Sequence, residues 1–249
     1  MSDLISIIIP YYKKKLFFSK AIKSVLRQSY KNFEIILIYD DISRSELKFV
    51  NKILKKIKKK KIIINKENLG AGISRNKGIK AAKGNFIAFL DADDIWHKDK
   101  LREQVNFMNV NKINFSYTDY SIVNENEKII KKIKVPRIVK YRNLLCSCYI
   151  GLSSVIINSK LLKLDTFPNL KTKEDYVLWL KLSKKNVKML GVNKNLTYWR
   201  KTNESLSSSS MQKLKDAYIV YNKYMKFNML NSLILTFILS INFIKKRYL

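Results

Sequence analysis

The sequence predicts an α/β fold whose sheet is parallel at least in its first half. Apolar, β-branched runs alternate with segments of helical spacing along this part of the chain, and such alternation is typical of α/β sheets. The chain has 249 residues, 47% of them hydrophobic, so it can bury a substantial core and intrinsic disorder is excluded. Its 6 glycines and 3 prolines exclude a collagen-like or linker-like chain.

The first half of the chain supplies the strands and helices of this pattern. Continuous apolar runs suit strands that are buried on both faces. The predicted strands are residues 4–10, 33–39, 61–65 and 85–90. Between them, apolar residues recur on one stripe, as they do in helices that pack on a sheet. The predicted helices are residues 19–28, 45–60 and 72–82, and the second has a strongly basic outer face.

The second half is less regular. The spacing of its apolar residues predicts helices at 98–110, 173–184 and 211–226, and strands at 113–123 and 153–157. Residues 227–244 are mostly apolar, but asparagines interrupt them and a basic run follows at 245–247. A stretch of this length is near the lower limit of a membrane span, about 17 residues, and its asparagines favour a helix that lies in the membrane interface. The alternative is a helix packed on the domain.

Acidic residues follow two of the predicted strands. Right-handed crossovers place the carboxyl ends of parallel strands along one edge, and ligands bind outside that edge. Asp40 and Asp41 follow the second strand and Asp91, Asp93 and Asp94 the fourth, although the whole chain has only 19 acidic residues. Carboxylates are hard ligands that suit Mg²⁺ or Mn²⁺ and leave positions for phosphates. We predict a divalent-cation site here, and a solvated turn is the alternative.

The formal net charge of +31 predicts an anionic partner, which would be nucleic acid, an acidic membrane surface or a phosphorylated substrate. Lysine dominates the basic residues, whereas arginine, which reads bases through paired hydrogen bonds, is scarce. Sequence-specific DNA recognition is therefore not expected. A coding sequence rich in A and T would also raise the lysine content, and this explanation stays open.

The cysteines and the histidine do not form a recognisable site. Cys146 and Cys148 are too close for an ordinary disulfide and lack the C-x-x-C spacing of redox or zinc sites, so we expect two buried thiols. The single histidine, His97, cannot build a zinc site, and a packing or surface role is favoured over a metal or phosphate contact. The run at 4–10 has no basic region before it and does not resemble a signal peptide. We expect a cytoplasmic or cytoplasm-facing protein.

Four segments carry a resemblance to a known family. They are ISIIIPYYKK, FEIILIYDDIS, NLGAGISRNKGIKAAKGNFIAFLDADDIWHKDKL and KEDYVLWLKL, in this order, and the later YWRKTNESLSSS fits the same pattern. Over residues 4–110 and 151–206 the chain resembles family 2 glycosyltransferases, in particular bacterial transferases that build lipopolysaccharide, capsule or teichuronic-acid chains. The resemblance implies the GT-A fold, a Rossmann-like mixed sheet flanked by helices, with a C-terminal helical extension.

The resemblance also implies a division of the chain. Residues 1–110 would form the half that binds the nucleotide sugar, and residues 111–210 would form the acceptor-binding half of the same GT-A domain. Residues 211–249 would form C-terminal amphipathic helices, a tail that associates with the membrane.

Catalytic residues follow from the resemblance as well. Asp91, Ala92 and Asp93 match the family's D-x-D motif, which makes Asp93 the primary ligand of Mn²⁺ or Mg²⁺ and places Asp91 near the ribose or the metal. Glu174 and Asp175 match an acidic pair whose second member is the general base. Asp175 would take the proton of the acceptor hydroxyl in a single displacement, and by analogy with glycosidases one such step inverts the configuration. The alternative is that acidic residues simply favour a helix's first turn.

The resemblance assigns a set of residues to the nucleotide sugar. They are Pro10, Tyr11, Tyr12, Asp40, Asn68, Gly70, Arg75, Asp91, Ala92 and Arg200. Tyr12 is the family's usual aromatic beside the base, whereas Tyr11 replaces a small residue. Asp40 would accept a hydrogen bond from the uracil N3–H, or else form an Asx turn. Arg75 would oppose phosphate charge or pair with a sheet-edge aspartate, and Arg200 would contact the diphosphate or be solvated.

The implied function is an inverting, divalent-metal-dependent transfer of a hexose or N-acetylhexosamine. The sugar would pass from a UDP-sugar to a hydroxyl of a surface-glycan precursor such as O-antigen or capsule, carried on a lipid diphosphate. The basic protein would act peripherally on the anionic inner face of the bacterial plasma membrane. A basic nucleic-acid-binding module is one alternative, but the chain has no reader motif and we expect no nucleic-acid partner. A nucleotidyltransferase is another, and it would carry a glycine-rich phosphate loop where this chain has PYYKKK.

Overall fold

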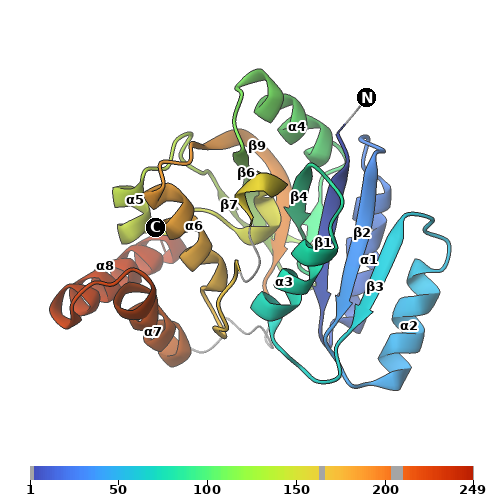
Figure 1. The fold of residues 1–249 in the computed structure, drawn as a ribbon, viewed down its shortest axis with the longest axis horizontal. Coiled ribbons are helices and arrows are strands. Elements are labelled where there is room, and N and C mark those ends of the chain that lie inside the picture. The colour runs from blue at the N-terminus through green and yellow to red at the C-terminus, as the bar shows by residue number, and fades with distance from the viewer. Residues whose placement is uncertain (1–2, 163–165, 203–209, 249) are drawn as a thin grey trace.

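One mixed sheet extends through the protein (Figure 1). The computed structural model describes residues 3–162, 166–202 and 210–248. The strands are β1 (Ile5–Tyr11), β2 (Phe33–Tyr39), β3 (Lys60–Ile64), β4 (Phe86–Phe89), β5 (Ile95–Trp96), β6 (Phe115–Val123), β7 (Ile129–Ile133), β8 (Ile156–Asn158) and β9 (Met189–Arg200). Their order in the sheet is β3-β2-β1-β4-β8-β6-β9-β5, and β7 pairs with β6. Strands β1 to β4 are parallel, and β8 runs antiparallel to both of its neighbours. The predicted α/β class is confirmed.

Helices cover both faces of this sheet. They are α1 (Lys15–Leu26), α2 (Arg44–Leu54), α3 (Ala71–Ala81), α4 (Lys100–Val110), α5 (Tyr141–Cys146), α6 (Glu174–Lys184), α7 (Ser210–Ile219) and α8 (Met229–Tyr248). Short 3₁₀ turns occupy Leu152–Ser154 and Ser159–Leu161, and a π-helical turn, Val220–Tyr224, follows α7.

Several boundaries differ from the sequence predictions. Helix α2 ends at Leu54 rather than residue 60, because Lys60 already pairs with Ile35 in the sheet. Residues 152–154 form a 3₁₀ turn, so the strand predicted at 153–157 is confined to β8. The strand β9 was not predicted, since polar residues interrupt its sequence, but it pairs along β6.

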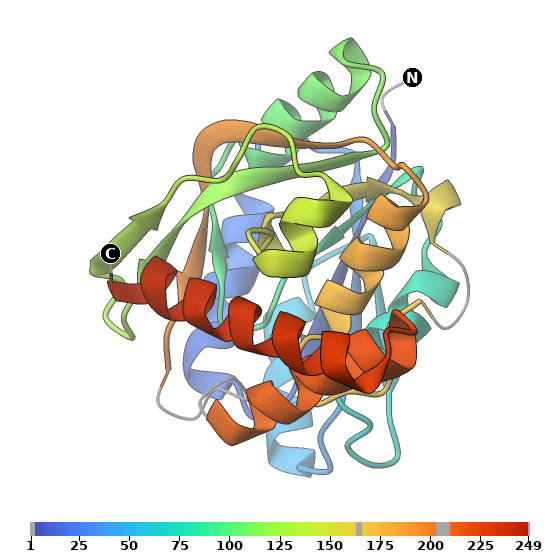
Figure 2. The same cartoon turned by 90° about the vertical axis from the view of Figure 1, so that its left-hand side faces the viewer.

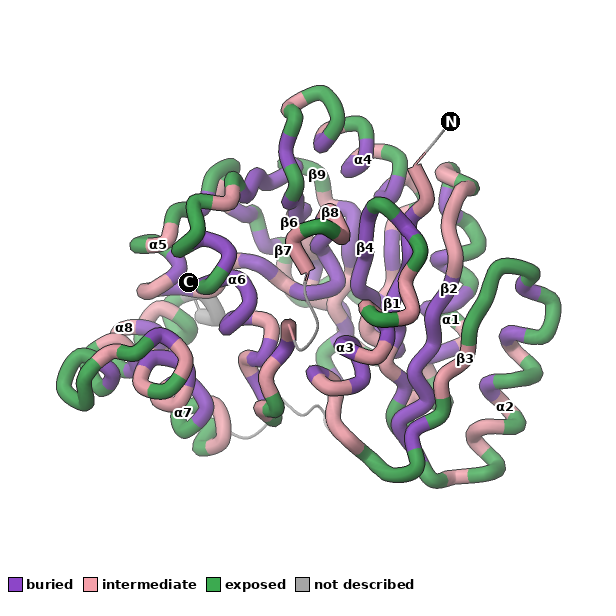
Figure 3. The backbone as a smooth tube through the Cα atoms, in the orientation of Figure 1, coloured by how far each residue is buried: buried purple, intermediate pink, exposed green. Residues whose placement is uncertain are grey.

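Alternate residues of β1 face opposite sides of the sheet. Ile7 and Ile9 belong to a core shared with α1, α2 and α4, whereas Ile8 belongs to the core shared with α3 and α6. Helix α3 packs so closely that a Cβ on Gly78 would lie 2.5 Å from Cγ2 of Ile8. Because α3 follows a parallel strand, its amino end lies at the edge where the strands end. Figure 3 shows the central strands buried, whereas much of α2 and of α8 is exposed.

The C-terminal helices pack together beside the sheet. Figure 2 shows α8 running across the front of the molecule, and it packs on both α7 and α5. The last carbonyls of α5, which a helix leaves without partners, accept hydrogen bonds from Tyr176 of α6, Tyr221 of the π-helical turn and Asn242 of α8. These bonds fix α5, α6 and α8 to one another.

Helix α7 is joined to the start of α6 by a buried carboxylate. Asp216 Oδ2 accepts hydrogen bonds from the backbone nitrogen of Thr172 at 2.9 Å and from its hydroxyl at 2.8 Å. The hydroxyl groups of Tyr176 and Tyr221 lie 2.9 Å apart. The segment that leads into α6 is therefore part of the same packed unit as α7 and α8.

Two smaller expectations concern the cysteines and the tail. Cys146 and Cys148 do not form a disulfide with each other, as expected from their spacing, but both are half-buried rather than buried. None of the described helices is long and apolar enough to cross a membrane.

Candidate active site

Side chains from distant parts of the sequence meet at the edge of the sheet where β1 and β4 end. Asp91 and Asp93 follow β4, Lys14 follows β1, and Arg75 lies in the second turn of α3. Glu174 begins α6 and completes the group. The D-x-D motif therefore lies at the edge where acidic residues were predicted, and Glu174 of α6, which was not part of that prediction, joins it there.

Arg75 connects these two acidic groups. Its Nη2 lies 2.7 Å from Oδ1 of Asp91, and its Nη1 lies 2.5 Å from Oε1 of Glu174. The guanidinium is buried, and it lies over the ring of Phe167. Of the two roles predicted for Arg75, the structure shows the ion pair with a sheet-edge aspartate. The second partner, Glu174, was not foreseen, because the two residues are 99 positions apart.

Asp93 pairs with a lysine that the sequence analysis did not single out. Lys14 Nζ lies 2.8 Å from Oδ2 of Asp93, and both side chains are largely buried. Burial raises the pKa of Asp93 and the Asp91 charge raises it further, whereas Lys14 opposes the shift. In the sequence Lys14 is one of three consecutive lysines, and nothing in that run distinguishes the one that reaches the carboxylate.

Asp94, the last residue of the acidic run, holds neighbouring segments of the protein together. It is fully buried, and its carboxylate accepts hydrogen bonds from the hydroxyl of Ser153 at 2.6 Å and from the backbone nitrogen of Arg200 at 2.9 Å. Burial raises its pKa well above the ordinary value, and the neighbouring Asp93 and Asp91 add to the shift. This carboxyl group holds β9 and the 3₁₀ turn of Ser153 against the D-x-D motif.

The D-x-D motif suits a divalent ion that takes most of its ligands from elsewhere. In the described part of the chain no three acidic, histidine or cysteine residues form a group that could hold a metal ion. Asp91 and Asp93 nevertheless offer two carboxylates at one edge, and one of them already pairs with a cationic ammonium group. Mg²⁺ is commonly held by one or two carboxylates together with water and substrate phosphates. The residues present fit an ion of that kind.

The two members of the acidic pair are not equivalent. Glu174 is buried and pairs with Arg75, whereas Asp175 is half-buried and accepts a hydrogen bond from the backbone nitrogen of Tyr176. Burial raises the pKa of Asp175 to about 7, the neighbouring Glu174 adds to the rise, and Arg75 opposes it. A carboxyl group that titrates near neutral pH suits proton transfer in general acid–base chemistry.

Asp40 organises the loop that leads into α3. Its Oδ1 accepts hydrogen bonds from Asn65 Nδ2 at 2.7 Å and from the backbone nitrogen of Leu69 at 2.8 Å. Its Oδ2 accepts one from the backbone nitrogen of Gly70 at 2.9 Å, and Asn68 donates to its carbonyl. A carboxylate has about four lone-pair sites, so one acceptor position remains.

Pro10, Tyr11 and Tyr12 stand at the end of β1 but face different surroundings. Tyr11 is buried, stacks on Tyr39 with the ring centroids 5.5 Å apart, and donates a hydrogen bond to Glu46. The side chain of Tyr11 is therefore part of the core. Tyr12 is 37% exposed, so only this aromatic ring is open to a ligand.

Arg200 is not the solvated surface residue that was one of the two alternatives for it. It is 2% exposed, and its guanidinium donates to the carbonyls of Asp93 and Glu125 at 2.9 and 2.8 Å and lies over the ring of Phe17. Its hydrogen-bonding groups are thus used inside the protein, where they close β9 over the acidic edge. Residues 203–209 of the YWRKTNESLSSS pattern lie outside the described residues.

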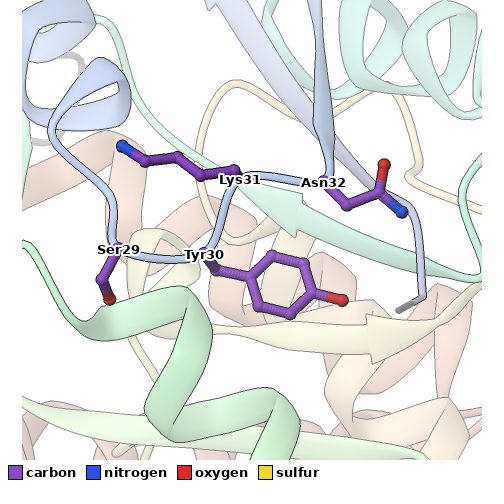
Figure 4. Close-up of a pocket in the computed structure, with 4 residues that line it drawn as sticks. All are labelled: Ser29, Tyr30, Lys31 and Asn32. Atoms are coloured by element: carbon purple, nitrogen blue, oxygen red, sulfur yellow. The ribbon is translucent and has the colours of Figure 1, made fainter. Parts of the chain in front are cut away.

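Two other features lie outside the cluster. His97 is partly exposed and accepts a hydrogen bond from the backbone nitrogen of Asp99, which fits the surface role favoured for it. A shallow pocket is lined by Ser29, Tyr30, Lys31 and Asn32 (Figure 4), the residues just before β2. It therefore lies at the opposite edge of the sheet from the acidic residues.

The chain is similar in sequence to known glycosyltransferases. The model of the family described as "Glycosyl transferase family 2" matches residues 6–162. The putative teichuronic acid biosynthesis glycosyltransferase TuaG of Bacillus subtilis is 34% identical over 224 residues, which are 88% of each chain. UDP-Glc:alpha-D-GlcNAc-diphosphoundecaprenol beta-1,3-glucosyltransferase WfgD of Escherichia coli is 37% identical over 225 residues, which are 90% of this chain and 87% of WfgD.

Solved structures show the same architecture. Residues 1–349 of S. aureus TarS in complex with UDP-GlcNAc match with a TM-score of 0.73 and 21% identity, over 92% of this chain and 69% of that one. The mannosyltransferase PcManGT of Pyrobaculum calidifontis, in complex with GDP-Man and Mn²⁺, matches with a TM-score of 0.71 and 12% identity, over 94% of this chain and 70% of that one. The expected GT-A arrangement with a C-terminal helical extension is thus confirmed.

Proposed function

The chain belongs to glycosyl transferase family 2, and from that premise we propose that it is an inverting, divalent-metal-dependent transferase acting on a UDP-sugar. The proposed reaction moves a hexose or N-acetylhexosamine to a hydroxyl group of a surface-glycan precursor carried on a lipid diphosphate. Two of the comparisons support this choice. The name of WfgD includes UDP-Glc and a diphosphoundecaprenol-linked sugar, and the structure of TarS was solved in complex with UDP-GlcNAc.

The observation that carries the proposal is the bridge made by Arg75. One end of its guanidinium pairs with Asp91 of the D-x-D motif, and the other pairs with Glu174, the residue before Asp175. A single buried side chain therefore fixes the start of the helix that carries the proposed base relative to the D-x-D motif, beside which the donor's diphosphate would bind. Such fixed placement matters because reacting groups must be held within a few tenths of an ångström of productive geometry, roughly 0.5 Å.

In the proposed mechanism Asp175 removes the proton of the acceptor hydroxyl. The hydroxyl oxygen forms a bond to the anomeric carbon from the face opposite the diphosphate, and the bond from that carbon to the UDP oxygen breaks with its electron pair leaving on UDP. One displacement inverts the anomeric configuration, by analogy with single-step glycosidases. A divalent ion held by Asp93 and Asp91 would neutralise charge on the departing diphosphate as a Lewis acid.

The remaining assignments concern the donor. We assign Tyr12 and Pro10 to the base, the free acceptor position of Asp40 to the uracil N3–H, and the loop of Asn68 and Gly70 with Ala92 to the nucleotide sugar. Arg75 acts by positioning carboxylates. Tyr11 and Arg200 are not assigned to the ligand, because the polar groups of their side chains already hydrogen-bond to other residues of the protein.

The proposed location is the cytoplasmic side of the bacterial plasma membrane, with peripheral attachment. A membrane-bound acceptor would be reached there, and a formal charge of +31 favours contact with anionic lipid. Residues 111–210 are assigned to the acceptor. A nucleic-acid-binding module is not favoured, because it would leave the acidic edge without a role. A nucleotidyltransferase is not favoured, because the chain belongs to glycosyl transferase family 2.

A donor screen tests the proposal. Release of UDP is measured from UDP-Glc, UDP-Gal, UDP-GlcNAc and UDP-GalNAc with Mn²⁺ and a lipid-diphosphate acceptor. We expect acceptor-dependent turnover of one of them with inversion of the anomeric configuration. A product that retains the donor's configuration would contradict the single displacement, and tight salt-sensitive DNA binding without any UDP-sugar binding would contradict the transferase assignment as a whole.

A further inference from the structure

Helix α8 presents most of its large apolar residues outward, whereas Leu235 and Leu239 pack on the core. An ordinary surface helix turns its apolar stripe toward the core and its polar side toward solvent. In α8 the large exposed side chains include Met229, Leu230, Leu233, Ile234, Phe237 and Ile241, of which Met229, Leu230 and Phe237 are each about two-thirds exposed, at 68, 67 and 67%. At 100° per residue these side chains share one side of the helix. They form what we call the outer face of α8.

The side of α8 that faces the protein is rich in hydroxyl groups. Ser232 is fully buried and Thr236 is 9% exposed. The hydroxyls of Ser232, Thr236 and Ser240 each donate a hydrogen bond to the carbonyl four residues earlier, at 2.7–2.8 Å. Buried hydroxyl groups are costly unless they are paired, and here the helix pairs them itself. The helix can therefore bury its polar stripe and leave its apolar face without a partner in the described chain.

Positive charge lies at both ends of the outer face. After Asp216 the sequence contains no Asp or Glu, whereas Lys223, Lys226, Lys245, Lys246 and Arg247 all follow it. The exposed Lys226 lies just before α8, and the exposed Lys245 lies near its end. An apolar face of a helix with cations at both ends suits an anionic lipid surface, where acyl chains take the apolar residues and headgroups take the cations.

We propose that the outer face of α8 is the surface by which the protein docks on an anionic bilayer, with the helix lying in the plane of the membrane. The proposal deepens the peripheral location given above, and it rests on the proposed function for the membrane-bound acceptor. The in-plane orientation follows from the attachment of α8 along its length to α5 and α7, and from the finding that no described helix could span a bilayer.

A second copy of the chain is the other occupant such a face would fit. Pairing two outer faces would bring the cations of one copy close to those of the other, and like charges at such an interface are repulsive. An anionic bilayer offers acyl chains to the apolar residues and negatively charged headgroups to the cations. The charge pattern therefore favours lipid over self-association.

Vesicle binding with matched variants tests the docking surface. The full chain is sedimented with vesicles of phosphatidylethanolamine and phosphatidylglycerol, and with vesicles of phosphatidylcholine alone. The outer-face variant carries Leu230→Ser, Ile234→Ser and Phe237→Ser, and the control carries Val110→Ser, Ile129→Ser and Ile130→Ser, which replace equally exposed apolar residues elsewhere. We expect the outer-face variant to lose at least tenfold in partitioning to anionic vesicles and the control to keep wild-type binding. Equal binding by both variants would overturn the proposal.

A second readout locates the helix directly. The indole introduced by Phe237→Trp should be quenched by lipids brominated on their acyl chains, and a signal insensitive to them would overturn the in-plane insertion. Raising NaCl from about 0.1 M to about 1 M shortens the Debye length from about 10 to about 3 Å and should weaken binding without abolishing it. Sedimentation of the lipid-free protein by ultracentrifugation completes the test, since a dimer that the outer-face variant dissociates, with vesicle binding unchanged, would assign the face to a second copy.

Failure of docking and failure of the transferase assignment remain distinguishable. UDP release to a short-chain, water-soluble acceptor needs no membrane, so the outer-face variant should keep wild-type turnover with it. A protein that binds vesicles but turns over no UDP-sugar would contradict the proposed function and leave the docking surface in place.

Discussion

Arg75 and Glu174, 99 positions apart in the sequence, form a buried ion pair with Nη1 and Oε1 separated by 2.5 Å. The same guanidinium pairs with Asp91, so one arginine neutralises carboxylates from both halves of the site. Removing a partner from a buried ion pair is costly, because it leaves an uncompensated charge.

Arg75→Met should therefore lower the free energy of unfolding by about 3–5 kcal/mol, the usual cost of breaking a buried pair from one side. Arg102→Met is the matched control, since Arg102 pairs with Asp99 on the surface, where such pairs contribute about 0–1 kcal/mol. Urea unfolding followed by circular dichroism gives both values. Similar losses in the two variants would mean that the Arg75 bridge stabilises the fold no more than a surface ion pair does.

Asp175→Asn should abolish transfer while donor binding survives. The amide is close in shape to the carboxylate but cannot accept the hydroxyl proton, and positioned acid–base groups contribute about 10²- to 10⁴-fold to rate. We expect kcat to fall by that range and the Kd of UDP with Mn²⁺, from calorimetry, to stay within a factor of about two, or 0.4 kcal/mol. Parallel loss of binding and turnover would remove Asp175 from the role of base.

The pH dependence should reveal the raised pKa of Asp175. Only the ionised carboxylate is a base, and burial raises its pKa to about 7, so kcat/KM should increase with pH up to and through neutrality. Glu174→Gln keeps an acceptor for Arg75 but removes a charge that raises this pKa, so the acid limb should move to lower pH. A limb at the same pH in wild type and variant would show that another group controls it.

Lys14→Met should strengthen metal binding. The ammonium group of Lys14 pairs with Asp93, and a divalent ion would have to displace it. The expected gain in Mn²⁺ affinity is about fivefold, which corresponds to roughly 1 kcal/mol for a partly exposed pair. Lys15→Met makes the same charge change beside Phe49 and serves as the control, and Asp93→Ala should lose the binding. Titration of free Mn²⁺ by electron paramagnetic resonance measures all four proteins, and weaker binding in Lys14→Met would show that Lys14 assists the metal instead.

The features that could be predicted from the sequence are those that depend on residues close together in the chain. The runs that became β1 to β4 are continuous and β-branched, and the D-x-D motif follows one of them directly, so strand and site could be placed together. The strand β9 was missed because Asn193, Lys194 and Asn195 interrupt its apolar pattern where its register with β6 shifts. Local spacing cannot show such pairings, which form between residues far apart in the chain.

The same limit explains the arginine and lysine positions. Arg200 is followed in sequence by polar residues that suggest a surface, yet its partners are carbonyl groups more than 70 positions away. Lys14 looks like its neighbours Lys13 and Lys15 until β1 brings it beside the end of β4. Tertiary contacts alone distinguish these residues.

The hydrogen bonds from Thr172 to Asp216 have a geometric consequence for the proposed enzyme. They join α7, and through it α8, to the start of the helix that carries Asp175. On a bilayer, the tilt of the docked protein would then set the height of the base above the lipid headgroups. An acceptor sugar anchored by its lipid presents its hydroxyl groups at different heights, so the choice of linkage would depend on how the enzyme sits as well as on the shape of its pocket.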